Sequence, residues 1–202
     1  MPLLDVKNLK VYFPAKHGAF SRARDFVKAV DDVSFTIAPG ETLGLVGESG
    51  CGKTTLGRAI VRLVELTAGS ILFEGENLAQ LNGATLRARR RNVQMIFQDP
   101  YGSLNPRMTV ADIIAEALDI HGLVDTQSAR QKQIAELLQA VGLDAAYAQR
   151  YPHEFSGGQR QRVSIARALA LHATIILADE PTSGLDTRTA RHILTLFRNI
   201  AH

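Results

Sequence analysis

The stretch "GESGCGKTT", Gly47 to Thr55, constrains the fold more than any other part of this sequence, because it fits the pattern G-x-x-x-x-G-K-[ST]. An apolar run, Thr42 to Val46, precedes it, and apolar residues with helical spacing follow from Leu56 to Leu63. A glycine-rich loop of this pattern between a strand and a helix is typical of a phosphate-binding loop. The sequence therefore predicts an α/β fold with such a loop, and a glycine-rich turn that only resembles the motif is the alternative.

The chemistry expected of this loop follows from its residue types. Its three glycines let the backbone approach phosphates with the N–H groups turned inward. Lys53 is expected to reach the β- and γ-phosphates, and the hydroxyl of Thr54 to ligate Mg²⁺. Cys51, the single cysteine, is interpreted as a chance residue at a variable position of the motif, and redox control or a metal is the alternative. The full set expected to border the nucleotide is Gly47, Glu48, Ser49, Gly50, Cys51, Gly52, Lys53, Thr54 and Thr55.

Apolar, β-branched runs separated by helical segments support the α/β class. The runs are Leu43–Val46, Ser70–Phe73, Val93–Phe97 and Ile175–Ala178. The first and last have almost no polar interruption, which is typical of central parallel strands covered on both faces. A nucleotide site is then expected at the carboxyl ends of these strands.

The two remaining regions have other patterns. Leu4–Phe13 and Val33–Ile37 are expected to form an antiparallel region, joined by a basic loop over Pro14–Lys28. Between about Asp99 and Arg150 the pattern is helical, clearest at Val110–Leu118 and Ser128–Val141. The sequence therefore predicts a helical insertion in the α/β fold.

Composition limits the function classes. A hydrophobic fraction of 46% in 202 residues is that of a globular protein, and no apolar run is long enough to span a membrane. The net charge of +3 and an arginine cluster at Arg87–Arg91 would allow a nucleic-acid patch. A solvated helix end is the alternative, and we assign no nucleic-acid partner because no aromatic residues interleave with the arginines. The start of the chain has no secretory pattern, which favours the cytoplasm.

Two acids follow the last apolar run, in the order Asp179-Glu180. Asp179 is expected to hold Mg²⁺ beside Thr54, and Glu180 to polarise the attacking water as the catalytic base. A polar turn before Pro181 is the alternative. Gln98 ends another strand and could contact both Mg²⁺ and that water, or be a solvated loop residue.

A second anion-binding element is predicted at "FSGGQ", Phe155 to Gln159, before a long helical stretch. Ser156 and the free N–H groups of Gly157 and Gly158 would form a helix start suited to an anion. A capped helix with a glycine turn is the alternative. Two chains head to tail could each supply one element to a shared nucleotide, which predicts a two-fold dimer with two sites.

The ordered set GESGCGKTT, Gln98, FSGGQ, ILADEP and Ser183–Asp186 resembles the nucleotide-binding subunit of ATP-binding-cassette (ABC) transporters over essentially the whole chain. The resemblance implies a P-loop NTPase (RecA-like) parallel-sheet fold and ATP hydrolysis. It also implies an ATP–Mg²⁺ site at Lys53, Thr54 and Asp179, with Gln98 as a further metal and catalytic contact and Glu180 as the base. Ser156 to Gln159 would then bind the partner's γ-phosphate, Ser183–Asp186 would line the dimer interface, and Phe13, or else Tyr12, would stack on adenine.

Within the family, "QDPYGSLNPRMTV" and "RYPHEFSGGQRQRVSIARAL" resemble the group that imports dipeptides, oligopeptides and nickel. This implies transmembrane permease subunits, a second ATP-binding subunit and, indirectly, a solute-binding protein as partners, at the cytoplasmic face of the cell membrane. Import of glutathione or another small solute, and a soluble ABC-type ATPase, are the alternatives.

The resemblance also implies one domain over residues 1–202. Its core would comprise 1–98 and 171–202, and its helical subdomain 99–170. The family's histidine on a strand past the glutamate would fall beyond residue 202, and His192 does not fit that role. We therefore expect a truncated domain that binds ATP and hydrolyses it poorly.

Overall fold

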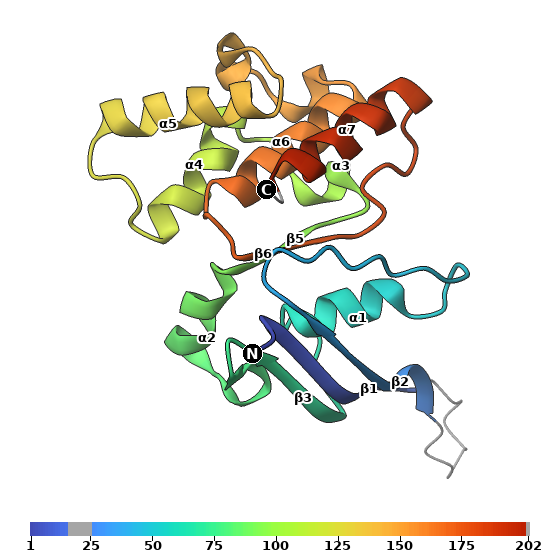
Figure 1. Cartoon of the computed structure of the whole chain (residues 1–202). Helices are drawn as coiled ribbons and strands as arrows, with labels where there is room; N and C mark the ends of the chain where they lie inside the picture. Colours follow the sequence, from blue (N-terminus) through green and yellow to red (C-terminus); the bar gives the residue numbers. More distant parts are fainter. Residues whose placement is uncertain (16–25, 201–202) are drawn as a thin grey trace. The chain divides into compact units, whose positions relative to one another are not determined.

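The computed structural model describes residues 1–15 and 26–200, which separate into two compact units, Met1–Arg87 and Ala88–Ile200. Each unit has its own sheet (Figure 1). The middle of the predicted loop Pro14–Lys28 lies outside the described residues, and its ends belong to strands.

The first unit is built on an antiparallel sheet in the order β2-β1-β3-β4. The strands are β1 (Leu4–Pro14), β2 (Phe26–Ile37), β3 (Ala68–Phe73) and β4 (Glu76–Asn77). Helix α1 (Lys53–Ile60) packs against it through Leu56, Ala59 and Ile60. The predicted antiparallel region is confirmed, and Ser70–Phe73 belongs to it rather than to a parallel sheet.

The apolar pattern of β1 shows how a bulge keeps one face buried. Leu4 and Val6 are buried two residues apart, as are Leu9 and Val11, but the step between the two pairs is three. The pairing with β2 shifts between Val6 and Leu9, where Asn8 has a φ of 47°. The extra residue restores the alternation, because a one-residue slip would otherwise turn the apolar set to solvent.

The second unit holds a two-stranded parallel sheet and most of the helices. β5 (Val93–Ile96) pairs with β6 (Ile175–Ala178), so that Val93 lies opposite Ile175. Around it are α3 (Pro100–Ser103), α4 (Val110–Ile120), α5 (Gln127–Ala140), α6 (Gly157–Leu169) and α7 (Thr187–Ile200). The short turns are η1 (Leu78–Gln80) in the first unit and η2 (Ala145–Gln149) and η3 (Pro152–Glu154) in the second, and α2 (Gly83–Arg90) spans the boundary.

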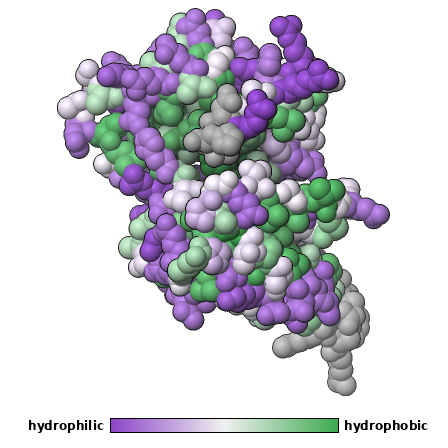
Figure 2. Space-filling view, in the orientation of Figure 1, coloured by the Kyte–Doolittle hydropathy of each residue, from purple (hydrophilic) through white to green (hydrophobic). Residues whose placement is uncertain are grey.

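The core of the second unit confirms the helical periodicity read from the sequence. One cluster joins Ile113, Ile114 and Leu118 of α4 to Leu138 of α5 and Ile165 of α6. The solvent side of α5 carries hydrophilic residues, visible in Figure 2. The helices therefore expose polar faces and bury apolar stripes, as amphipathic helices do.

The prediction for Leu43–Val46 is wrong in this structure. The segment belongs to neither sheet, and Leu43, Leu45 and Val46 are 45%, 53% and 93% exposed. An apolar run reports a preference for apolar neighbours, whereas a strand also requires a hydrogen-bonded neighbouring strand. The full cover predicted for Ile175–Ala178 is also incomplete, because Ile175 is buried but Ala178 is exposed.

Candidate nucleotide-binding site

The phosphate-binding loop lies in the first unit, and backbone geometry requires its last glycine. Gly52 is the N-cap residue of α1, with φ 98° and ψ 5°. A Cβ at this position would lie 2.0 Å from the carbonyl oxygen of Ala29 on β2. Only glycine combines this left-handed conformation with so close an approach. The packing of the loop on β2 therefore fixes where α1 begins.

Lys53 reaches back across the loop. Its ammonium Nζ donates hydrogen bonds of 2.7 Å to the carbonyl oxygens of Gly47 and Glu48, and lies 3.8 Å from Sγ of Cys51. The loop also closes on itself through the N–H of Cys51, which donates to the carbonyl of Glu48 at 3.4 Å. The cation and the N-terminal N–H groups of α1 together make the loop electropositive, which suits a phosphate.

Gln98 and Glu180 meet at the carboxyl ends of β5 and β6 in the second unit. The parallel register pairs Ile96 with Ala178, so both side chains follow their strands by two residues. Nε2 of Gln98 donates to Oε2 of Glu180 at 2.8 Å, and the N–H of Asp179 donates to the carbonyl of Ile96 at 2.9 Å. Two predicted site residues 82 positions apart in sequence are thus in direct contact.

Glu180 also has an unusual backbone. Its φ is 44°, a left-handed value that few non-glycine residues adopt. Such conformations are costly and cluster at functional sites. Five other non-glycine residues of the described ranges also have a positive φ, so the conformation supports a functional role for this carboxylate only together with its contact to Gln98.

The predicted second anion-binding element forms a capped helix start. Ser156 is the N-cap of α6, and its hydroxyl accepts from the N–H of Gln159 at 3.3 Å. The side-chain oxygen of Gln159 accepts in return from the N–H of Ser156 at 2.9 Å. This capping box consumes two acceptors and leaves the hydroxyl proton of Ser156 and the amide group of Gln159 as donors.

The two glycines of this element differ in their surroundings. A Cβ on Gly157 would meet only Cδ2 of Leu185 at 3.7 Å, an ordinary contact, and this glycine has no left-handed φ. A Cβ on Gly158 would lie 2.4 Å from Cγ2 of Thr189. Packing within the chain therefore explains glycine at position 158 but not at position 157.

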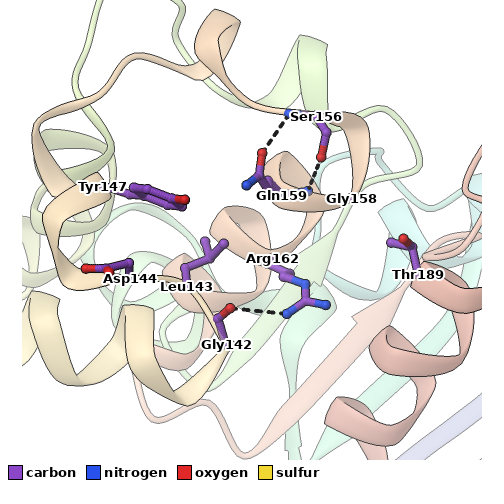
Figure 3. Close-up of a pocket in the computed structure, with 9 residues that line it drawn as sticks. All are labelled: Gly142, Leu143, Asp144, Tyr147, Ser156, Gly158, Gln159, Arg162 and Thr189. Atoms are coloured by element: carbon purple, nitrogen blue, oxygen red, sulfur yellow. Dashed lines mark hydrogen bonds between the residues drawn. The ribbon is translucent and has the colours of Figure 1, made fainter.

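A polar cavity of about 310 Å³ opens beside this helix start (Figure 3). Arg162 forms part of its wall, where Nη1 donates to the carbonyl oxygens of Val141 at 3.1 Å and Gly142 at 3.3 Å. Sequence reasoning included Ser156, Gly158 and Gln159 of the lining. It missed Gly142, Leu143, Asp144, Tyr147, Arg162 and Thr189. Only Gly142 carried a signal, since a glycine after a helix favours the left-handed conformation that it adopts here.

Tyr12 and Phe13, the two residues predicted to stack on adenine, differ in their contacts. The hydroxyl of Tyr12 donates to Asp31, which raises the pKa of the phenol, and the Lys28 ammonium lies 5.4 Å from the centre of its ring. The neighbouring residue Phe13 is 39% exposed. The ring of Tyr12 is thus held by contacts within the sheet, whereas the ring of Phe13 is accessible.

The described ranges, 1–15 and 26–200, include no helix with the length and hydropathy needed to cross a bilayer. In the same ranges, no three His, Cys, Asp or Glu side chains are grouped to hold a metal ion. Mg²⁺ at nucleotide sites takes one or two carboxylates and obtains its other ligands from phosphates and water. The side chains of Thr54 and Asp179 are of the type that such an ion requires.

The first unit has a glycine-rich loop closed by a lysine before a helix, and the second has parallel strand ends that carry an acid and an amide; both are features of a P-loop nucleotide-binding fold. Comparison with solved structures agrees. A dimeric ATP-binding cassette, MJ0796, bound to ADP and Pi aligns over 98% of this chain and 83% of its own, with a TM-score of 0.85 and 30% identity. A second dimeric structure of that cassette aligns equally well, with 82% of its chain covered.

The family is narrower than the fold. A family model described as ABC transporter matches residues 30–183, and the chain belongs to this family. The oligopeptide transport ATP-binding protein OppF of Bacillus subtilis is 55% identical over 199 residues, or 98% of this chain and 63% of the relative. The glutathione import ATP-binding protein GsiA of Escherichia coli is 51% identical over 98% of this chain and 32% of its own. The chain thus spans less than two thirds of the length of these relatives.

Proposed function

We propose that the chain is the ATP-binding part of an ABC importer for peptides, and that the full-length protein hydrolyses ATP to drive uptake. The observation that carries the proposal is the presence, in one family member, of two helix starts whose free N–H groups are suited to an anion. One is the loop closed by Lys53, and the other is the capped start of α6. The similarity to OppF over 98% of the chain supports peptide import.

The roles proposed for the nucleotide follow from the loop. Its backbone N–H groups and Lys53 bind the β- and γ-phosphates, and Phe13 stacks on adenine. Thr54 and Asp179 would hold Mg²⁺, which neutralises charge on the phosphates when bound. Thr55, Glu48, Ser49 and Cys51 border the same group.

For hydrolysis we propose Glu180 as the base that orients and deprotonates water, with Gln98 as its partner. The hydrogen bond of 2.8 Å between them holds the carboxylate in one orientation. A base must lie within hydrogen-bond reach of the proton that it removes, and a fixed orientation favours this. The amide of Gln98 could also contact Mg²⁺ and the attacking water beside Glu180.

We propose that the second element acts on the nucleotide of another chain. Ser156, Gly157, Gly158 and Gln159 would contact the γ-phosphate held by the partner's loop, in a head-to-tail dimer with two sites. Gly157 supports this, since the chain itself leaves room for a side chain there. The structures of MJ0796 are described as dimeric.

The proposed partners are permease subunits, a second ATP-binding subunit and, through the permeases, a solute-binding protein, at the cytoplasmic face of the membrane. The division into a core, 1–98 and 171–202, and a helical subdomain, 99–170, belongs to the same proposal, and the helical part would contact the permeases. Glutathione import is the second candidate, favoured by the similarity to GsiA.

The dimer is tested with Glu180→Gln in the full-length protein. The variant should accumulate an ATP-bound dimer, measured by light scattering with ATP and Mg²⁺, because binding persists while hydrolysis stops. Glu65→Gln, an exposed change outside the helices and strands, is the matched control and should behave as wild type. A Glu180→Gln protein that stays monomeric with ATP and Mg²⁺ would contradict the shared site.

The substrate is tested by uptake. Cells that lack this protein should lose import of a labelled tripeptide with ordinary α-peptide bonds, such as trialanine, and regain it with the wild-type protein. Retained import of the tripeptide together with lost import of labelled glutathione would favour the second candidate.

A further inference from the structure

Thr189, on the first turn of α7, contacts two segments that the proposed function uses. Hydrogen bonds from its side chain and its N–H reach the carboxylate of Asp186, with a distance of 3.0 Å from the N–H to Oδ1. Its methyl group, Cγ2, lies against the start of α6, where a Cβ on Gly158 would come within 2.4 Å (Figure 3). One side chain therefore joins the segment Ser183–Asp186 to the glycines of the capped helix start.

We propose that Thr189 is a positioning residue that sets the distance between the α6 start and the segment Ser183–Asp186. The inference rests on the proposed function, in which both segments face the second chain. Thr189 touches no nucleotide in this proposal and acts through Gly158 and Asp186. The requirement for glycine at position 158 follows from the same contact.

Contacts within the chain are enough to require glycine at position 158, without any contact to a phosphate. Gly158 lacks a left-handed φ, so alanine there meets no backbone strain, and its obstacle within the chain is the methyl group of Thr189. The next atoms of Thr189 lie 3.6 Å (Cβ) and 3.7 Å (Oγ1) from the same Cβ position, which are ordinary contact distances. Thr189→Ser would remove Cγ2 and keep the hydroxyl that bonds to Asp186.

The test is therefore a rescue experiment in the full-length protein. Gly158→Ala should shift the urea midpoint of the nucleotide-free protein to lower concentration and reduce the kcat of ATP hydrolysis by about tenfold or more, because an overpacked contact displaces both segments. Adding Thr189→Ser should restore the midpoint and bring kcat to within about threefold of Thr189→Ser alone. The affinity for ATP of the protein without a partner chain should change little, since that nucleotide is held by the loop of the first unit.

Gly157→Ala is the matched control, because the chain leaves room for its Cβ. It should not lower the urea midpoint, because alanine fits this helical position without strain, and Thr189→Ser should not improve its kcat. A Gly158→Ala protein whose midpoint and kcat are not restored by Thr189→Ser would overturn the inference. If the wild-type protein hydrolyses no ATP, the proposed function fails, whereas the urea midpoints still decide whether Thr189 imposes glycine at position 158.

Discussion

Replacing Gly52 with alanine should destabilise the nucleotide-free protein by about 2–5 kcal/mol. A non-glycine residue in a left-handed conformation costs about 1–2 kcal/mol, and Gly52 has a φ of 98°. Relief of an overpacked contact costs about 1–3 kcal/mol more, and here the added Cβ would lie 2.0 Å from the carbonyl oxygen of Ala29. A backbone oxygen cannot rotate away as a side chain can, so the loop or β2 must move.

The same loop offers a matched control. Gly50 also has a left-handed φ, 80°, but a Cβ there would meet no atom within 4 Å. Gly50→Ala should therefore cost only the backbone part, about 1–2 kcal/mol. The difference between the two variants isolates the contact with Ala29.

Urea unfolding followed by circular dichroism measures both variants. With a slope of about 2 kcal/mol per molar urea, the midpoint should fall by about 0.5–1 M for Gly50→Ala and about 1–2.5 M for Gly52→Ala. Equal shifts for the two variants would refute the argument that Ala29 fixes the loop. A larger shift for Gly50→Ala would refute the packing that we describe.

Three further predictions concern other parts of the chain. Ser156→Ala removes the N-cap acceptor of α6 and should lower the free energy of unfolding by about 1 kcal/mol, whereas Ser156→Asp should retain most of the cap's contribution; no loss in Ser156→Ala would show that the cap contributes nothing. A thiol reagent should label Cys51 more slowly with ATP and Mg²⁺ than with Mg²⁺ alone, because the thiol is exposed and lies beside the Lys53 ammonium; equal rates would count against nucleotide in this loop. Hydrogen bonds from Thr189 lower the pKa of Asp186 below 3.8, so its stabilising effect is present above that pH and is lost as the pH falls through the lower folded value. Asp186→Asn should make the acid limb of an unfolding curve shallower, and an unchanged limb would contradict this.

Much of the architecture could be read from side-chain patterns. Ile175–Ala178 is the strand that the sequence predicts, and the predicted helices at Val110–Leu118 and Ser128–Val141 match α4 and α5 within two residues. These elements bury apolar stripes whose spacing is visible in the sequence. Leu43–Val46 is also apolar but forms no strand. Strand formation requires hydrogen bonds to a second strand, and the composition of one segment does not identify that strand.

The candidate site also has residues that the sequence identifies and residues that only the structure identifies. Motifs identified Gln98 and Glu180, and the structure places them in contact because their strands are parallel and in register. The role of Thr189 could not be read from sequence, since a threonine in the first turn of a helix is unremarkable until its methyl group meets Gly158. Sequence identifies residues with distinctive chemistry, whereas residues that act by occupying space emerge only from packing.

At position 180 the left-handed backbone favours glycine for stability, whereas the proposed chemistry requires a carboxylate. Glycine would avoid a conformational cost of about 1–2 kcal/mol there, offset by its own entropic cost of about 0.5–1 kcal/mol. Glycine would also lose the hydrogen bond from Gln98, worth about 0.5–1.5 kcal/mol. A Glu180→Gly protein should therefore be about as stable as the wild type while lacking the carboxylate. In a library selected only for thermal stability, glycine should be tolerated or enriched at this position, whereas selection for uptake should remove it. The ratio between those two enrichments would measure how strongly transport, rather than folding, retains the glutamate.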